Sequence, residues 1–164
     1  MVILGIDPGL AIVGYGVINT LKGNSSVIDY GVINTPKEDS VPTRLEKIYE
    51  GMLGLIEKYN PDCIAIEELF FNTNTTTGIN VAQARGVVLL ACKQKGLKMF
   101  EYTPLQIKQA LTGYGKAEKK QIQFMVARLL NLKAVPKPDD AADGLAVALT
   151  HAQTARLGGL FSIR

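Results

Sequence analysis

The stretch Met1–Val17, MVILGIDPGLAIVGYGV, predicts how the chain begins to fold. Its first apolar run, 2–6, is typical of a strand that is buried on both faces. The run ends in the turn signal Asp7-Pro8-Gly9, and a second apolar run with two glycines follows. Asp7 is therefore expected where a central strand stops and the chain reverses. A carboxylate in that place either caps its own loop or must be solvated, paired or bound to a metal.

The rest of the chain alternates strands with helices. We predict further strands over 12–18, 27–34, 62–68 and 98–102, and helices over 43–59, 79–94, 104–111, 117–132 and 139–155. Thr103 is expected to cap the third helix, with Pro104 at its first position. This pattern indicates an α/β fold, a five-stranded mixed sheet flanked by helices. No linker divides it, so we expect one single domain over 1–157 and a flexible tail over 158–164.

The composition is that of an ordinary globular protein, with 164 residues of which 47% are hydrophobic and 20% charged. No apolar run approaches the roughly 20 residues that span a membrane. There is also no basic leader followed by an apolar segment, so we expect a cytoplasmic protein without a membrane partner. Cys63 and Cys92 lack a CxxC partner and are predicted as core residues in a reducing compartment. The single histidine, His151, argues against a His/Cys zinc site and is expected to be a packing or surface residue.

Four carboxylates stand out along this pattern, namely Asp7, Glu67, Asp140 and Asp143. Glu67 lies near the end of the strand over 62–68, and alternation places it on the face of Ala65. Asp140 and Asp143 are three residues apart in the first turn of the last helix, so they project on one face. These aspartates, with Asp139, could simply complement the helix dipole, but that explanation leaves Asp7 and Glu67 unexplained. If the first and fourth strands are parallel neighbours, Asp7 and Glu67 meet at one edge of the sheet.

Carboxylates that lie close together cannot all ionise unless a cation neutralises them. Ligation by oxygen alone suits Mg²⁺, with Mn²⁺ as a substitute. Two such ions about 4 Å apart would activate water and stabilise the leaving oxygen of a phosphodiester. On this hypothesis Asp7 and Asp140, assisted by Asp143, hold one ion, and Asp7 and Glu67 share the second.

The charge distribution favours an anionic partner. Seven lysines and two glutamates lie between Lys93 and Lys120. Lys116, Lys119 and Lys120 are expected at the start of a helix, where the macrodipole disfavours cations unless an anion such as DNA phosphate offsets them. A solvated charged face is the alternative. Phe70 and Phe71 are either core residues at a strand end or, in the case of Phe70, a base-stacking side chain.

Six motifs in order carry a resemblance to a known family: Asp7-Pro8-Gly9, Ala65-Ile66-Glu67-Glu68, Gln83-Ala84-Arg85-Gly86, Phe100-Glu101-Tyr102, Gly115-Lys116-Ala117-Glu118-Lys119 and Asp140-Ala141-Ala142-Asp143. Over essentially its whole length the chain resembles the RuvC family of bacterial Holliday-junction resolvases. The resemblance implies a ribonuclease H-like fold, a homodimer, and Mg²⁺-dependent cleavage of two opposed strands of a four-way DNA junction. It also implies work alongside the branch-migration proteins RuvA and RuvB.

The resemblance also implies roles for single residues. The family's metal-binding carboxylates match Asp7, Glu67, Asp140 and Asp143. Lys108 and Lys119 match lysines that contact DNA near the scissile phosphate, where Lys119 would bind the phosphate or help position the nucleophile. Phe70 matches an aromatic residue near the junction centre. The chain departs from the pattern at Glu68, where a familiar member has glutamine, and strand alternation favours Glu67 as the metal-facing residue.

Two other classes of protein share parts of this pattern. Actin-like ATPases and kinases also open with a strand, an Asp-x-Gly turn and a hairpin, but they need a second nucleotide-binding lobe that 164 residues cannot supply. A non-catalytic junction-binding module would not need Asp7, Glu67, Asp140 and Asp143 together. The resemblance, together with the four carboxylates, implies a Mg²⁺-dependent endodeoxyribonuclease that resolves four-way junctions by paired symmetric nicks in recombination and repair.

Overall fold

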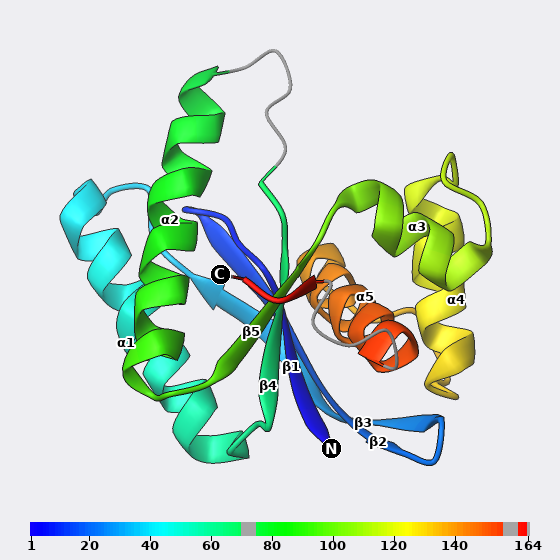
Figure 1. The fold of residues 1–164 in the computed structure, drawn as a ribbon. Helices are drawn as coiled ribbons and strands as arrows, with labels where there is room; N and C mark the ends of the chain where they lie inside the picture. Colours follow the sequence, from blue (N-terminus) through cyan, green and yellow to red (C-terminus); the bar gives the residue numbers. More distant parts are fainter. Residues whose placement is uncertain (70–74, 156–160, 164) are drawn as a thin grey trace.

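One mixed sheet of five strands forms the centre of the molecule in the computed structural model, which describes residues 1–69, 75–155 and 161–163 (Figure 1). The strand order is β3-β2-β1-β4-β5. The first three strands pair antiparallel, whereas β1 and β4, and β4 and β5, are parallel neighbours. The strands are β1 (Val2–Asp7), β2 (Ile12–Leu21), β3 (Asn24–Asn34), β4 (Cys63–Glu67) and β5 (Lys98–Tyr102). The predicted fold class is confirmed.

Helices cover both faces of the sheet (Figure 1). On one face lie α1 and α2, and on the other α5 packs directly on β1 and β2. The remaining pair, α3 and α4, packs on the outer side of α5. The helices are α1 (Val41–Tyr59), α2 (Thr75–Gln94), α3 (Pro104–Thr112), α4 (Lys119–Leu129) and α5 (Asp139–Thr154). Each face therefore has its own apolar core, and the two cores are separated by the sheet.

Local sequence signals set several helix ends as predicted. Asn60 adopts a left-handed conformation, with φ of 42°, and ends α1. Thr103 caps α3 in a reciprocal capping box with Gln106, and Pro104 occupies the first turn. Because α3 begins directly after β5, this cap fixes how the chain turns away from the sheet edge toward the region of Glu67.

The largest differences from the expected element boundaries lie in the β2–β3 hairpin, α2 and α4, while α1 begins at Val41 rather than 43. The β2–β3 hairpin is longer than predicted, because Lys22 and Gly23 have φ of 51° and 88° and close a two-residue turn that lets polar residues join the ladder. Helix α2 begins at Thr75 rather than 79, because a threonine is at most about 0.7 kcal/mol less favourable in a helix than alanine. Helix α4 spans 119–129 rather than 117–132, because Glu118 takes the N-cap position and Asn131 has φ of 51°.

The last described residues lie against the sheet edge. Ser162 forms an isolated bridge with Phe100 of β5, and the Ile163 backbone N–H donates to the Met99 carbonyl at 3.0 Å. Residues 161–163 of the expected tail are thus held on β5, while the rest of 158–164 lies outside the described residues. Within the described ranges, no helix combines the length and the apolar character that a bilayer crossing requires.

Candidate active site

Asp7 and Glu67 end neighbouring parallel strands. Ile6 pairs with Ile66 in the β1–β4 ladder, so the two acids follow at the same edge of the sheet. Ala65 lies in the core beneath α5, whereas Ile66 lies in the core beneath α1 and α2. Glu67 therefore projects on the α5 face, as alternation predicted. Glu68 is exposed, and its backbone N–H donates to the Tyr102 carbonyl at 2.8 Å.

Glycines bring α5 into backbone contact with the sheet. A Cβ atom added at Gly5 would lie 2.2 Å from the Gly144 carbonyl oxygen, and one at Gly14 would lie 2.0 Å from the Asp140 carbonyl oxygen. Only glycine permits this approach at these positions. Since Gly14 pairs with Asp7 in the β1–β2 ladder, the start of α5 is held beside Asp7. The close approach expected from the small residues around Asp140 and Asp143 is confirmed.

A cavity of about 260 Å³ collects acidic, basic and apolar side chains from β1, β4, α3, α4 and α5. Its lining consists of Asp7, Glu67, Pro104, Ile107, Lys108, Lys119, Ile122, Asp143 and Ala146. Three of the four predicted carboxylates thus share one cavity with two of the predicted lysines. The apolar wall formed by Pro104, Ile107 and Ile122 was missed by sequence reasoning, because these residues carry no chemical signal apart from their helical spacing.

The carboxylates in this cavity resist ionising together. Burial raises the pKa of Asp7 well above its ordinary value, and Glu67, Asp143 and Asp140 raise it further. Burial and the Asp143 charge raise the pKa of Glu67 to about 7. Burial also raises the pKa of Asp143, although Lys119 opposes this shift. Asp140 does not line the cavity, but its effect on the pKa of Asp7 places it within electrostatic reach of the site.

Lys119 is the cation most closely engaged with these acids. Its Nζ atom lies 3.0 Å from an Asp143 carboxylate oxygen and 4.0 Å from one of Asp139. Asp139 also accepts a hydrogen bond from Lys137 at 2.7 Å. Sequence reasoning assigned Lys119 to phosphate and missed its ion pair with Asp143, because the partners are 24 residues apart and on different helices.

The donor chemistry of the site fits a hard divalent cation. Oxygen atoms from β1, β4 and α5 surround one region, and their mutual repulsion is the kind that a 2+ ion relieves. Among the residues that the structure describes, no three or more His, Cys, Asp or Glu side chains form a group arranged to hold an ion. The carboxylates therefore fit a divalent cation in their charge and in their ligand type. In this structure the Asp143 carboxylate is paired with Lys119.

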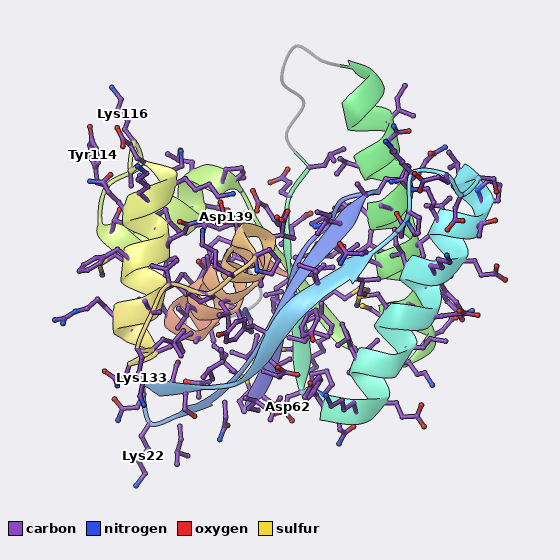
Figure 2. The ribbon with its side chains drawn as sticks, turned by 180° about the vertical axis from the view of Figure 1, so that it is seen from behind. Lys22, Asp62, Tyr114, Lys116, Lys133 and Asp139 are labelled. Carbon is purple, nitrogen blue, oxygen red and sulfur yellow. The ribbon has the colours of Figure 1, made fainter. Side chains whose placement is uncertain are left out.

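Lys116 and Lys120, two further predicted DNA-binding residues, do not line this cavity. Tyr114 and Lys116 lie together at the outer end of the α3–α4 connection, away from Asp139 at the start of α5 (Figure 2). Lys116 precedes α4 rather than beginning it, and Lys120 is the second residue of that helix. Lys120 lines a separate apolar hollow with Tyr114 and Phe124. Phe70 lies outside the described residues.

Other residues named in the sequence analysis have structural roles in the fold. His151 is buried, its Nδ1 atom lies 2.7 Å from the Tyr102 hydroxyl, and its ring packs on Phe100 at 4.3 Å between centroids. The packing role predicted for it is confirmed. Arg85 in α2 pairs with Glu101 in β5 at 2.6 Å, so two of the six motifs meet across the fold. Cys63 and Cys92 are buried free cysteines, as the predicted core positions require.

A sheet of this order, with acids at the carboxyl ends of β1 and β4 and at the start of α5, defines a nuclease of the ribonuclease H-like class. The chain belongs to the RuvC family, since the family model described as crossover junction endodeoxyribonuclease RuvC matches residues 3–151. Members of this family are metal-dependent nucleases.

Individual relatives support the assignment along the whole chain. The crossover junction endodeoxyribonuclease RuvC of Alkaliphilus oremlandii is 55% identical over 164 residues and covers 100% of both chains. The structure of Thermus thermophilus RuvC in complex with a Holliday junction substrate superposes with a TM-score of 0.93 at 35% identity, covering 99% of each chain. The yeast mitochondrial Holliday junction resolvase, at 15% identity and a TM-score of 0.65 over 92% of this chain and 78% of its own, shares the fold.

Proposed function

We propose that this protein resolves four-way DNA junctions in recombination and repair, by hydrolysing one phosphodiester bond in each of two opposed strands. The observation that carries the proposal is the single cavity in which Asp7, Glu67 and Asp143 face Lys108 and Lys119. Acidic side chains supply metal ligands there, and lysines supply partners for a phosphate. Membership of a family of crossover junction endodeoxyribonucleases supports this function for the whole chain.

The proposed cofactor is Mg²⁺, which Mn²⁺ can replace. Two ions held by Asp7, Glu67, Asp140 and Asp143 would supply an activated water and charge stabilisation for the leaving 3′ oxygen. Asp7 is the central ligand in this assignment, because Glu67 lies on one side of it in β4 and Asp140 on the other side above β2. Lys108 and Lys119 would then hold the phosphate over the acids, and Lys119 could instead help position the nucleophile.

Lysines beyond the cavity extend the proposed DNA contact. Lys120 lies next to Lys119 along α4, and Lys116 is exposed at the end of the α3–α4 connection (Figure 2). These lysines are suited to the phosphate backbone of a junction arm, where contacts fix orientation rather than read sequence. We assign Phe70 to stacking at the junction centre on the basis of the family resemblance.

Two cuts related by symmetry call for two active sites, and we propose a homodimer. Support comes from α2, where the large apolar side chains of Ile79 and Leu90 are exposed by 57% and 53% and, eleven residues apart, lie on one face of the helix. By family resemblance the dimer acts in the cytoplasm together with RuvA and RuvB. The nuclease domain proposed over 1–157 contains all the residues to which a role in cleavage is assigned.

The test of the function is cleavage of synthetic DNA. Purified protein is incubated with a four-way junction that has a mobile core and with a matched linear duplex, each with Mg²⁺ and with EDTA. Paired symmetric nicks on the junction alone, dependent on Mg²⁺, are expected. Junction binding without cleavage would instead indicate a binding module, and equal cleavage of both substrates would remove junction specificity. Calorimetric binding of ATP would point to the actin-like class.

A further inference from the structure

An ammonium group lies among the carboxylates that a metal ion needs. Lys119 is based on α4 and reaches across to α5, where its Nζ atom contacts Asp143 at 3.0 Å and approaches Asp139 at 4.0 Å. Both Lys119 and Asp143 line the cavity that contains Asp7 and Glu67. The contact therefore joins a predicted phosphate-binding residue to a predicted metal ligand inside the site itself.

The charge of Lys119 acts on the whole acidic group. It lowers the pKa of Asp7, of Glu67 and of Asp143, in each case against the larger effect of burial. A fixed cation that stabilises several ionised carboxylates serves them as a counterion. A divalent ion would serve the same acids more strongly, and it would compete with Lys119 for the Asp143 oxygen.

Lys108 provides the contrast. It lines the same cavity and lowers the pKa of Glu67, but within the described residues it forms no ion pair. The two lysines thus share a charge and a location, and they differ in whether a metal ligand is engaged. Any effect that follows from charge alone should be similar for both, whereas an effect of the ion pair should belong to Lys119.

We propose that Lys119 is an internal counterion that holds Asp143 in the metal-free protein, and that a DNA phosphate draws it away so that Asp143 becomes available to the metal. The proposal rests on the proposed function, because it takes the phosphate to be that of a junction. The side chain of Lys119 is 55% exposed, so its amine can turn toward a phosphate without opening the core. Binding of DNA and binding of metal are then coupled, each strengthening the other by the same factor.

The experiment measures metal binding directly, by the loss of the electron paramagnetic resonance signal of free Mn²⁺. Wild type, Lys119→Gln, Lys119→Arg and Lys108→Gln are titrated with and without a four-way junction whose core carries phosphorothioate linkages to slow cleavage. Without DNA, Lys119→Gln is expected to bind Mn²⁺ about tenfold more tightly than wild type, in the usual range of coupling between sites. Lys108→Gln should change the affinity by about twofold or less. Lys119→Arg keeps the charge and should resemble wild type.

The titrations with the four-way junction present test the coupling between DNA binding and metal binding. Addition of the junction should raise the Mn²⁺ affinity of wild type by a clearly larger factor than that of Lys119→Gln, since the variant has no counterion to displace. Circular dichroism melting curves establish that every variant is folded. The proposal is overturned if Lys119→Gln binds Mn²⁺ no more tightly than wild type, if Lys108→Gln gains as much, or if the junction affects wild type and Lys119→Gln equally.

Cleavage by wild type is measured in parallel, and it distinguishes a failure of this proposal from a failure of the proposed function. Mg²⁺-dependent junction cleavage together with an unchanged Mn²⁺ affinity in Lys119→Gln would reject the counterion role and leave the function intact. A wild-type protein that neither cuts the junction nor binds Mn²⁺ in its presence would reject both.

Discussion

The two faces of the sheet are packed in opposite ways. Toward α1 and α2, the central strands present large aliphatic side chains such as Leu4, Ile6 and Ile64, all fully buried. Toward α5, the positions nearest the acids on the same strands are small, as at Gly5 and Ala65. Consecutive residues of one strand thus face a conventional apolar core on one side and a helix backbone on the other.

The difference shows how a fold divides stability from catalysis. Each large side chain buried under α1 and α2 contributes about 1.5–3 kcal/mol of hydrophobic free energy. Glycine on the α5 face contributes no such burial, but it lets Asp140 and Gly144 contact β1 and β2 through backbone atoms. Both faces therefore bury apolar cores, but on the α5 face glycines also bring a helix close enough to position acidic groups that repel one another.

The largest effect is expected from Asp7→Asn, which changes the acidic group on the α5 face of the sheet. Loss of the central carboxylate should lower the cleavage rate of a four-way junction by at least about a thousandfold, because both proposed ions share it. Junction affinity in EDTA should stay within about twofold of wild type, since the lysines make the phosphate contacts. Single-turnover cleavage and gel-shift titration measure the two quantities. A parallel loss of affinity would contradict the metal-binding role given to Asp7.

Adjacent substitutions in β1 compare the two faces directly. Gly5→Ala places a methyl group 2.2 Å from the Gly144 carbonyl oxygen and must push α5 away, so cleavage should fall at least about tenfold even where the protein remains folded. Leu4→Ala should cost about 2–5 kcal/mol of unfolding free energy with little change in the cleavage rate of the folded fraction. Urea denaturation and single-turnover kinetics separate the effects.

A third substitution controls for the Gly5 comparison. Gly54 lies in α1, and a Cβ atom there would meet nothing within 4 Å. Gly54→Ala should therefore leave cleavage unchanged and stabilise the protein by up to about 1 kcal/mol. If Gly5→Ala behaved like Gly54→Ala, the contact between β1 and α5 would not control the site.

The charge of Glu67 should make the metal-free protein less stable as pH rises. Its pKa is about 7 in the folded protein and 4.5 as a reference, so the folded state binds the proton more tightly than the unfolded state. Stability from this group is present below pH 4.5 and is lost as pH rises to about 7. Glu67→Gln should therefore be more stable than wild type at pH 8 without metal, by on the order of 2 kcal/mol.

Thermal unfolding in EDTA at acidic and basic pH measures this effect. Saturating Mg²⁺ should stabilise wild type above pH 7 more than it stabilises Glu67→Gln, because the ion neutralises the carboxylate that the variant lacks. A stability difference that is independent of pH would show that Glu67 is not held at a raised pKa.

The smallest effect is expected when lysines on opposite sides of the sheet are compared for their effect on the salt dependence of junction binding. Lys119→Ala should weaken junction binding and reduce the slope of log affinity against log salt by about 1, as expected for one lost phosphate contact. Lys47 in α1, which pairs with Asp39 at 2.5 Å, lies under the opposite face, and Lys47→Ala should leave the slope unchanged. Gel-shift titrations over a range of KCl concentrations measure both slopes. Equal slopes for wild type and Lys119→Ala would remove Lys119 from the phosphate contacts.

Much of the fold could be predicted because its signals are local. The strand ending at Asp7, the Thr103-Pro104 cap and the Asn60 stop each depend on a few adjacent residues. The sequence predicts the β2–β3 hairpin at the right place but with strands that are too short. Asn24 and its serine neighbours pair with β2 only because the turn before them is tight. A ladder pairing of this kind depends on the partner strand, which a local pattern does not contain.

The sequence by itself determined the order of elements, the family, and the four carboxylates that end two strands and begin a helix. These properties follow from alternation, capping and motif order along the chain. Only the tertiary structure decided how closely α5 approaches Gly14, which residues wall the cavity, and that Lys119 engages Asp143. The reason is physical: such contacts join segments far apart in sequence, and their distances are set by the volumes packed between backbones rather than by local propensity.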